Sequence, residues 1–287
     1  MRALRVVFVG CYFCVALLPL MWLLLTSFKL RDESITVYPK FVPTLAAEVA
    51  PDDPYFRANL DAYRQLSEVY AGTNRAFVHY LGNSLLIGLF STGCSVLIGT
   101  CAAYGFSRFN IPGSKDWLFF ILSTRFLPPL AVVVPVLMMY REFNLQNSHL
   151  GLVLLYTAFN MSLAVWLMKG FIDEIPTAYE EAALVDGYTR LQAFRLIILP
   201  RAASGMAVTA VFCLISAWNE YGFAMTLNNQ QAVTVPVYFA GLQGNVHGLP
   251  WPQIGAGVLL FVAPIVVFTA LVRKHLLRGV TFGTIKN

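Results

Sequence analysis

Six long apolar segments constrain the fold of this 287-residue chain more than any other feature. They cover residues 6–28, 80–105, 117–140, 150–168, 202–227 and 254–272, and each has at least 19 residues. A helix that rises about 1.5 Å per residue needs about 20 residues to cross about 30 Å of hydrocarbon. Charged residues make up only 12% of the chain, about half the share that is usual in a soluble domain. We therefore predict an all-α polytopic membrane protein with six transmembrane helices in a single domain, residues 1–287.

The basic residues predict how the chain is oriented. If the N-terminus is cytoplasmic, 12 of the 20 lysines and arginines fall in cytoplasmic segments, and the two short external loops hold only Arg141. The first external loop, residues 29–76, is too long to count as topological evidence. The first apolar segment exceeds a typical signal-peptide core, so we expect it to stay uncleaved. Both termini are thus predicted to be cytoplasmic.

The third apolar segment is interrupted by prolines. Pro128, Pro129 and Pro135 each remove a backbone donor, and Pro128 and Pro129 are adjacent. A span of this kind needs neighbouring helices to satisfy its free carbonyl groups. We expect it to be kinked and packed against other helices.

Several chemistries are excluded by the distribution of reactive residues. All five cysteines lie inside apolar segments, and the four histidines are scattered without the spacing of metal ligands. The net charge of +5 follows from the bias of basic residues toward one side, and no basic run is interleaved with aromatic residues outside a membrane boundary. We expect neither a metal site nor nucleic-acid binding.

The two long external loops each carry an apolar pattern. In the first, Phe56, Leu60, Tyr63, Leu66 and Tyr70 recur at helical spacing, which predicts a short amphipathic helix. This helix could lie on the membrane surface, anchor the second span or contact a partner. The second loop, residues 228–253, is uncharged and aromatic, so it could dock a protein or plug the bundle.

The loop between the fourth and fifth spans has the most informative local pattern. Pro176 and the acids after it favour a helix that begins near this proline, and Gly187 can take the left-handed conformation that ends it. Thr189 and Gln192 have the spacing of a capping box, which starts a second helix. Pro200 should bend the chain where the fifth span begins. We predict a short helix that projects into the cytoplasm, as either a connector or a lever gripped by a partner.

These residues also carry a family resemblance. Glu181-Ala182-Ala183, then Gly187 after three residues, then Leu199-Pro200, match the spacing of the EAA loop in permease subunits of bacterial binding-protein-dependent ABC importers. Motifs similar to the carbohydrate branch occur at residues 83–85, 103–108, 128–129, 217–221 and 278–286. Within that branch the chain resembles the six-span, maltose-type permease subunit, although its first external loop is longer than in shorter members.

The resemblance implies a heteromeric importer in the bacterial cytoplasmic (inner) membrane. The expected partners are membrane lipid, a second permease subunit, a dimer of ATPase subunits and an extracytoplasmic solute-binding protein. ATP and Mg²⁺ would be bound by the ATPase subunits, so this chain would bind no cofactor and would not itself be an enzyme. The sequence agrees, because it has no G-x-x-x-x-G-K-S/T loop: Gly113-Ser114-Lys115 lacks the upstream glycine.

The resemblance also assigns residues to the contact with the ATPase. The coupling loop covers residues 170–200, and its expected contact residues are Glu181, Ala182, Ala183, Asp186, Gly187, Leu199 and Pro200. The C-terminal tail, residues 273–287, would reach toward the ATPase dimer with Gly279, Thr281, Gly283 and Lys286.

Two charges inside the spans point to a solute path. Arg125 and Glu220 would each cost about 2.5–3.5 kcal/mol facing lipid, so they should face the bundle interior. At 1.5 Å per residue they lie about 12 Å and about 27 Å from the cytoplasmic ends of their spans, so no mutual salt bridge is expected. Trp218, Asn219 and Tyr221 flank Glu220 and suit sugar hydroxyls. We expect these five residues to line the path, unless Glu220 bonds a neighbouring helix or a docked protein and Arg125 is structural.

The function favoured by these patterns is carbohydrate import, with a sugar, a polyol or a glycoside as solute. An importer permease for another solute is the main alternative. An ion-coupled carrier or channel would need internal repeats or many intramembrane polar groups, and a membrane-embedded enzyme would need clustered acids and bases in the spans. The sequence has only the two intramembrane charges and no repeat.

Overall fold

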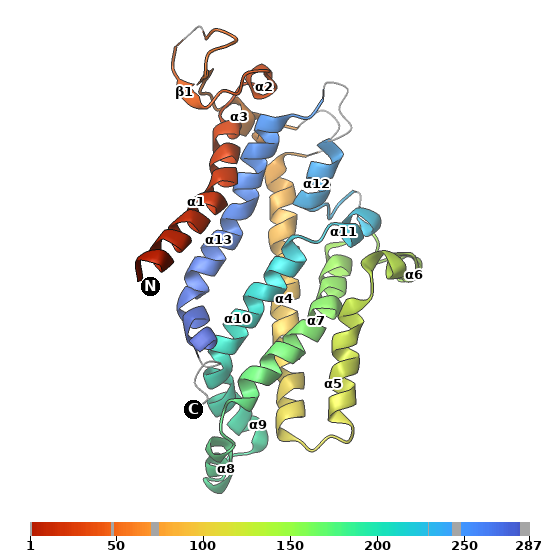
Figure 1. The fold of residues 1–287 in the computed structure, drawn as a ribbon. Helices are drawn as coiled ribbons and strands as arrows, with labels where there is room; N and C mark the ends of the chain where they lie inside the picture. The colour runs from red at the N-terminus through yellow and green to blue at the C-terminus, as the bar shows by residue number, and fades with distance from the viewer. Residues whose placement is uncertain (1, 47–48, 70–74, 229, 243–247, 282–287) are drawn as a thin grey trace. The chain divides into compact units, whose positions relative to one another are not determined.

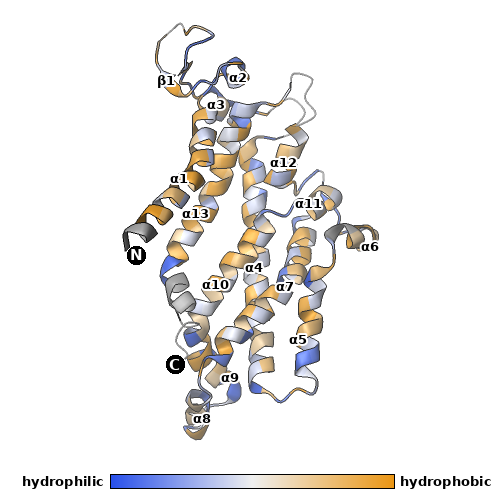
Figure 2. Cartoon of the chain, in the orientation of Figure 1, coloured by the Kyte–Doolittle hydropathy of each residue, from blue (hydrophilic) through white to orange (hydrophobic). Residues whose placement is uncertain are grey.

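A computed structural model of the chain describes residues 2–46, 49–69, 75–228, 230–242 and 248–281 (Figure 1). In these residues, five helices are long and apolar enough to cross a membrane. They are α1 (Arg2–Ser27), α4 (Phe77–Arg108), α7 (His149–Asp173), the helix Arg190–Trp218 that ends with α10 (Leu199–Trp218), and α13 (Trp251–Thr281). Hydrophobic residues prevail along them (Figure 2). The prediction of a polytopic α-helical membrane protein is confirmed.

The third predicted span is a broken helix. It consists of α5 (Ser114–Ser123), a 3₁₀ turn at Thr124–Phe126, and α6 (Pro129–Glu142). The two parts differ in direction by 92°, so a sixth crossing exists only if they form one span. Pro128 has an extended backbone (ψ 126°), as expected for a residue that precedes a proline. The kink predicted from the prolines is therefore confirmed.

The chain divides into two compact units, Met1–Leu81 with Tyr238–Pro264, and Gly82–Val237 with Ile265–Asn287. The first unit contains α1, α2 (Arg31–Ser34), α3 (Asp61–Ser67) and a parallel pair of strands, β1 (Val42–Thr44) and β2 (Tyr55–Arg57). In the second unit, α11 (Gly222–Leu227) follows α10, and α12 (Val235–Gly241) runs into the first unit.

The predicted amphipathic helix in the first long loop is shorter than the apolar pattern suggested. The helix covers only Asp61–Ser67, so it includes Tyr63 and Leu66. Phe56 lies in β2, fully buried, because its strand pairs with β1; its assignment to the helix was wrong. Leu60 is the residue before the helix, and Tyr70 lies outside the described residues.

Small residues let the helices of the second unit approach closely. A Cβ added at Gly99 of α4 would lie 2.6 Å from Cβ of Ala164 in α7, and one at Gly205 of α10 would lie 2.4 Å from Cγ of Phe171. Small residues at helix contacts are typical of membrane bundles, where packing and not water exclusion holds helices together. The resulting bundle of α4, α7 and α10 supports the segments that follow.

Candidate functional site

The short helix α8 (Ala178–Val185) begins two residues after the predicted start at Pro176 and ends as predicted. Gly187 has φ +88°, which is the left-handed conformation that glycine adopts without steric cost. The N–H of Gly187 donates to the carbonyl of Leu184 at 3.1 Å, and the N–H of Tyr188 donates to that of Ala183 at 3.0 Å. These two bonds form a Schellman motif, which fixes a sharp turn directly after α8.

The segment between this turn and α10 is helical throughout. Thr189 and Gln192 form the predicted capping box, with the Thr189 N–H 2.7 Å from Gln192 Oε1 and the Gln192 N–H 3.3 Å from Thr189 Oγ1. After α9 (Arg190–Ala193), residues Phe194–Ile198 form a π-helical turn, and the Leu199 N–H bonds to the Phe194 carbonyl five residues earlier. Pro200, which has no N–H to donate, follows this widened turn.

A buried ion pair joins α8 to the end of α4. The Glu180 carboxylate accepts from Arg108 Nε at 3.0 Å and from the Tyr104 hydroxyl, and both charged side chains are about 95% buried. Arg108 Nη2 also donates to the carbonyls of Ile172 (3.2 Å) and Ile175 (2.7 Å), at the end of α7 and just beyond it. Such a pair needs further hydrogen bonds to offset its desolvation, and here both partners have them. Glu180 and Arg108, which we call the root of α8, therefore fix this helix to α4 and α7.

A second contact joins α8 to the beginning of α10. The Arg201 guanidinium lies 4.3 Å from the centre of the Tyr179 ring, within the range of a cation–π interaction. Arg201 Nη1 also donates to the Ile197 carbonyl at 3.2 Å. The cation–π contact and the Glu180–Arg108 ion pair hold α8 against the bundle, so it can move little without moving the helices behind it.

The opposite face of α8 is open to a partner. Glu181, Ala182, Asp186 and Gly187 are exposed, whereas Ala183 is buried against the chain itself. Leu199 is half-buried and Pro200 exposed. Large apolar side chains around α8 are also exposed, namely Tyr179, Val185, Tyr188 and Leu191; Val185 exposes 88% of its surface. Exposed apolar groups gathered on one short protrusion are typical of a protein contact surface.

Glu220 lies at a break between α10 and α11. Its carboxylate accepts from the backbone N–H groups of Phe223 (2.9 Å) and Ala224 (3.1 Å), which are free at the beginning of α11. The Tyr156 hydroxyl of α7 donates to it at 2.6 Å. Glu220 thus bonds a neighbouring helix and caps its own, which is the structural alternative that the sequence left open.

Glu220 also lines a cavity of about 190 Å³ in the second unit. Its polar walls come from Arg125, Tyr156, Asn160, Ser216 and Glu220. Arg125 Nη2 lies 3.4 Å from Ser216 Oγ, and Asn160 Oδ1 is buried without a hydrogen-bond partner among the described residues. Typical ligand pockets measure about 300–1,000 Å³, so a solute would need this cavity to widen.

The structure places Arg125 and Glu220 on one cavity, although the sequence predicted them at different depths. Both side chains line the same cavity, with Arg125 in the 3₁₀ turn at the break of the third span and Glu220 at the break between α10 and α11. No ion pair joins the two charges within the described residues, in line with the sequence prediction. Trp218, Asn219 and Tyr221 do not line the cavity. Trp218 is buried beside Gly88 of α4, and Asn219 Nδ2 bonds the Ile215 carbonyl at 2.8 Å.

The predicted tail contacts are only partly covered by the structure. Gly279 and Thr281 belong to α13, and Gly283 and Lys286 lie outside the described residues. Across the described part of the chain, no group of three or more His, Cys, Asp or Glu side chains could hold a metal ion.

Sequence reasoning missed Glu180, which fixes α8 to the bundle. The EAA spacing drew attention to Glu181, and the two glutamates are adjacent. A usable signal did exist: Tyr104 and Arg108 are one helical turn apart at the polar end of a span, a spacing that lets both side chains meet one carboxylate.

Fold and site together define a polytopic membrane protein with a short helix that is fixed to the bundle on one side and exposed on the other. Residues 95–282 match the family described as binding-protein-dependent transport system inner membrane component. The chain belongs to this family of ABC transporter permeases and is a multi-pass protein of the inner membrane.

The relatives and the solved structures agree with this assignment. The chain is 32% identical to the trehalose transport system permease protein SugB of Mycobacterium tuberculosis, over 94% of this chain and 93% of that protein. It is 30% identical to the trehalose/maltose transport system permease protein MalG of Thermococcus litoralis, over 88% and 92%. A bacterial ABC transporter involved in the import of the acidic polysaccharide alginate has the same fold, with a TM-score of 0.72 at 21% identity over 95% of each chain.

Proposed function

We propose that this chain is the permease subunit of an ATP-driven importer for a carbohydrate, delivered by an external solute-binding protein. The family supports binding-protein-dependent transport, and relatives named for trehalose, maltose and galactooligosaccharides support a sugar, polyol or glycoside as solute. The observation that carries the proposal is the exposed face of α8 opposite its buried Glu180–Arg108 root.

In this proposal α8 is the coupling helix and lies on the cytoplasmic side, as do both termini. Its exposed residues Glu181, Ala182, Asp186 and Gly187 sit in a cleft of one ATPase subunit. Closure of the ATPase dimer pushes on α8, and the buried root passes the motion to α4 and α7. Rotation of these helices alternates access to the path between the two sides of the membrane.

The remaining partners follow from the same scheme. A second permease subunit completes the path, and ATP and Mg²⁺ bind to the two ATPase subunits, because this sequence has no phosphate-binding loop. The tail residues Gly279, Thr281, Gly283 and Lys286 reach toward the ATPase dimer. The cavity beside Arg125 and Glu220 widens into the solute path when the helices rotate.

The experiment that tests this function compares uptake with ATP hydrolysis in the reconstituted complex. Glu181→Lys and Gly187→Asp alter the exposed face and the turn of α8, so we expect ATP hydrolysis to continue while uptake is lost. Glu142→Lys, an exposed charge reversal at the end of α6, is the matched control and should transport normally. Normal uptake by both α8 variants, or activity of the chain alone without ATP, would refute the proposal.

The orientation and the solute have separate tests. A cysteine in place of the exposed Val185 should react with a membrane-impermeant maleimide only from the cytoplasmic side. Thermal stabilisation of the cognate binding protein by one member of a carbohydrate panel would identify the solute. Stabilisation by an amino acid or an ion instead would leave the importer assignment in place and replace the carbohydrate.

A further inference from the structure

The first unit contains a larger cavity, of about 460 Å³, which the proposed transport mechanism does not use. Three segments of this unit line it: residues 29–32 after α1, α3 with the two residues that follow it, and residues 250–253 at the beginning of α13. Its volume lies within the range of sites that enclose small molecules. The polar groups on its wall determine what it can hold.

Gln253, on the first turn of α13, lines this cavity with an unsatisfied amide. The residue is 2% exposed, and neither Oε1 nor Nε2 has a hydrogen-bond partner among the described residues. A buried amide without partners costs free energy, and nine in ten or more such groups in proteins are satisfied. This amide needs a group that donates to its oxygen and a group that accepts from its nitrogen.

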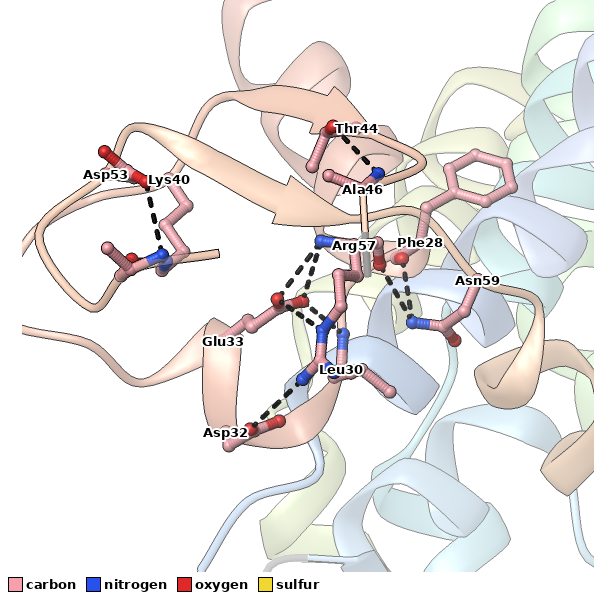
Figure 3. Close-up of polar contacts among 11 residues, drawn as sticks. Phe28, Leu30, Asp32, Glu33, Lys40, Thr44, Ala46, Asp53, Arg57 and Asn59 are labelled. Atoms are coloured by element: carbon pink, nitrogen blue, oxygen red, sulfur yellow. Dashed lines mark hydrogen bonds and ion pairs between the residues drawn. The ribbon is translucent and has the colours of Figure 1, made fainter. Parts of the chain in front are cut away.

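Lys29 contributes a buried cation to the same wall. It is also 2% exposed, and its ammonium group rests 4.3 Å from the ring centre of Trp22 and 5.3 Å from that of Phe56. The acid that acts on its charge is Glu33, but the Glu33 oxygens already accept from Arg57 Nε at 3.4 Å and from backbone N–H groups (Figure 3). In the described part of the chain, Lys29 therefore forms no ion pair.

The other charged side chains on the cavity wall are mainly acidic, and the remaining lining residues are uncharged. Asp32, Asp61 and Glu68 line it, against two cations, Lys29 and Arg31. Arg31 Nη2 already donates to the carbonyl of Gly248 at 2.8 Å. An anionic ligand would satisfy Lys29 but would meet three carboxylates and leave the Gln253 oxygen without a donor. Hydroxyl groups both donate and accept, so a single chemistry satisfies the ammonium, the amide and the carboxylates.

We propose that this cavity is a binding site for a neutral polyhydroxylated small molecule, such as a sugar or a polyol, held by Lys29 and Gln253 with the carboxylates of Asp61 and Glu68 accepting from its hydroxyls. The site belongs to the first unit, whereas the cavity beside Glu220 belongs to the second. The donors and acceptors of this wall select the ligand, whichever solute the importer carries.

Saturation-transfer NMR on the full chain in lipid nanodiscs, without any binding protein, tests the site with trehalose as probe. We expect saturable transfer to trehalose that sorbitol competes away and gluconate, its anionic counterpart, does not. Gln253→Leu and Lys29→Met should each weaken the apparent affinity at least tenfold. Gln230→Leu, an exposed glutamine of the second unit, is the matched control and should bind as the original chain does.

Two further variants distinguish loss of the binding site from loss of the fold and from effects elsewhere in the chain. Glu68→Lys changes an exposed residue of the cavity wall, so it should weaken binding even if the buried substitutions disturb the fold. Glu142→Gln, at an exposed position of the second unit that lines neither cavity, should leave the transfer unchanged.

Three outcomes would overturn the proposal. The first is no transfer to trehalose from the unaltered chain, and the second is equal transfer from Gln253→Leu, Lys29→Met and Glu68→Lys. The third is a set of cavity variants that bind trehalose as the unaltered chain does but associate more weakly with the solute-binding protein. This result would make the cavity a binding site for a protein segment. Failure of carbohydrate uptake by the whole complex would instead refute the proposed function and leave this transfer intact.

Discussion

Replacing Glu180 by alanine should release α8 from the bundle without disturbing the exposed face of this helix. The substitution leaves Arg108, whose side chain is 6% exposed, without its counter-ion, and removes the acceptor of the Tyr104 hydroxyl. Removing one partner of a buried ion pair costs about 3–5 kcal/mol. Arg108 keeps its bonds to the carbonyls of Ile172 and Ile175, so we expect the lower end of that range, about 3 kcal/mol.

Amide hydrogen exchange measures this loss directly, because it reports local opening. Since 1.4 kcal/mol corresponds to a factor of ten, the amides of residues 178–188 should exchange about 100-fold faster in Glu180→Ala. Glu181→Ala is the matched control: it removes an adjacent but exposed glutamate, so exchange should change by no more than a few-fold. In the complex, Glu181→Ala should weaken the contact with the ATPase, although α8 stays in place in this variant.

A double-mutant cycle separates the ion pair from general disruption. Adding Arg108→Met to Glu180→Ala should recover part of the lost protection, because the uncompensated cation is then gone. Glu180 does not anchor α8 if the amides of Glu180→Ala exchange within three-fold of those in the original chain, or if those of Glu181→Ala exchange just as fast.

Four other substitutions test separate features. Gly187→Ala should cost about 1–2 kcal/mol because of the positive φ, and the Tyr188 amide should exchange about 5- to 30-fold faster; an unchanged rate would argue against the turn. Gly99→Ala should push α4 away from Ala164 and lower the thermal midpoint in detergent by several degrees, and a raised midpoint would contradict this close packing. Burial lowers the pKa of Lys29 below its usual 10.5, so stability should rise with pH between the folded and unfolded values, and the advantage of Lys29→Met at neutral pH should shrink toward pH 10.5; a gap that widens would contradict the sign. Glu220→Ala should impair uptake while the ATPase still assembles with the chain, and unchanged uptake kinetics would make Glu220 purely structural.

Much of the fold could be predicted because a bilayer demands long apolar segments, and these are visible along the chain. The end of α8 and the beginning of α9 could be predicted from local sequence, since Gly187 and the Thr189–Gln192 capping box act within a few residues of themselves. The break in the third span followed from adjacent prolines. Local chemistry determined each of these features.

The remaining features depend on residues far apart in the sequence. Glu180 meets Arg108 across 72 positions, and no local pattern distinguishes it from Glu181. Phe56 fits a helical period but is held in a strand by its pairing opposite Pro43. Arg125 and Glu220 come from segments far apart in the sequence, and only the packing of those segments brings them to one cavity. Tertiary packing determines these contacts, and the periodicity of apolar residues along the chain does not predict them.

The π-helical turn at Phe194–Ile198 places one residue more in a turn than an α-helix holds. Since successive α-helical residues are 100° apart, deleting a single residue there would restore a regular ladder and swing everything before it by about that angle around the helix axis. The number of residues in this one turn therefore determines the direction in which α8 points. Changes of length in this stretch would therefore be far more disruptive than conservative changes of its side chains.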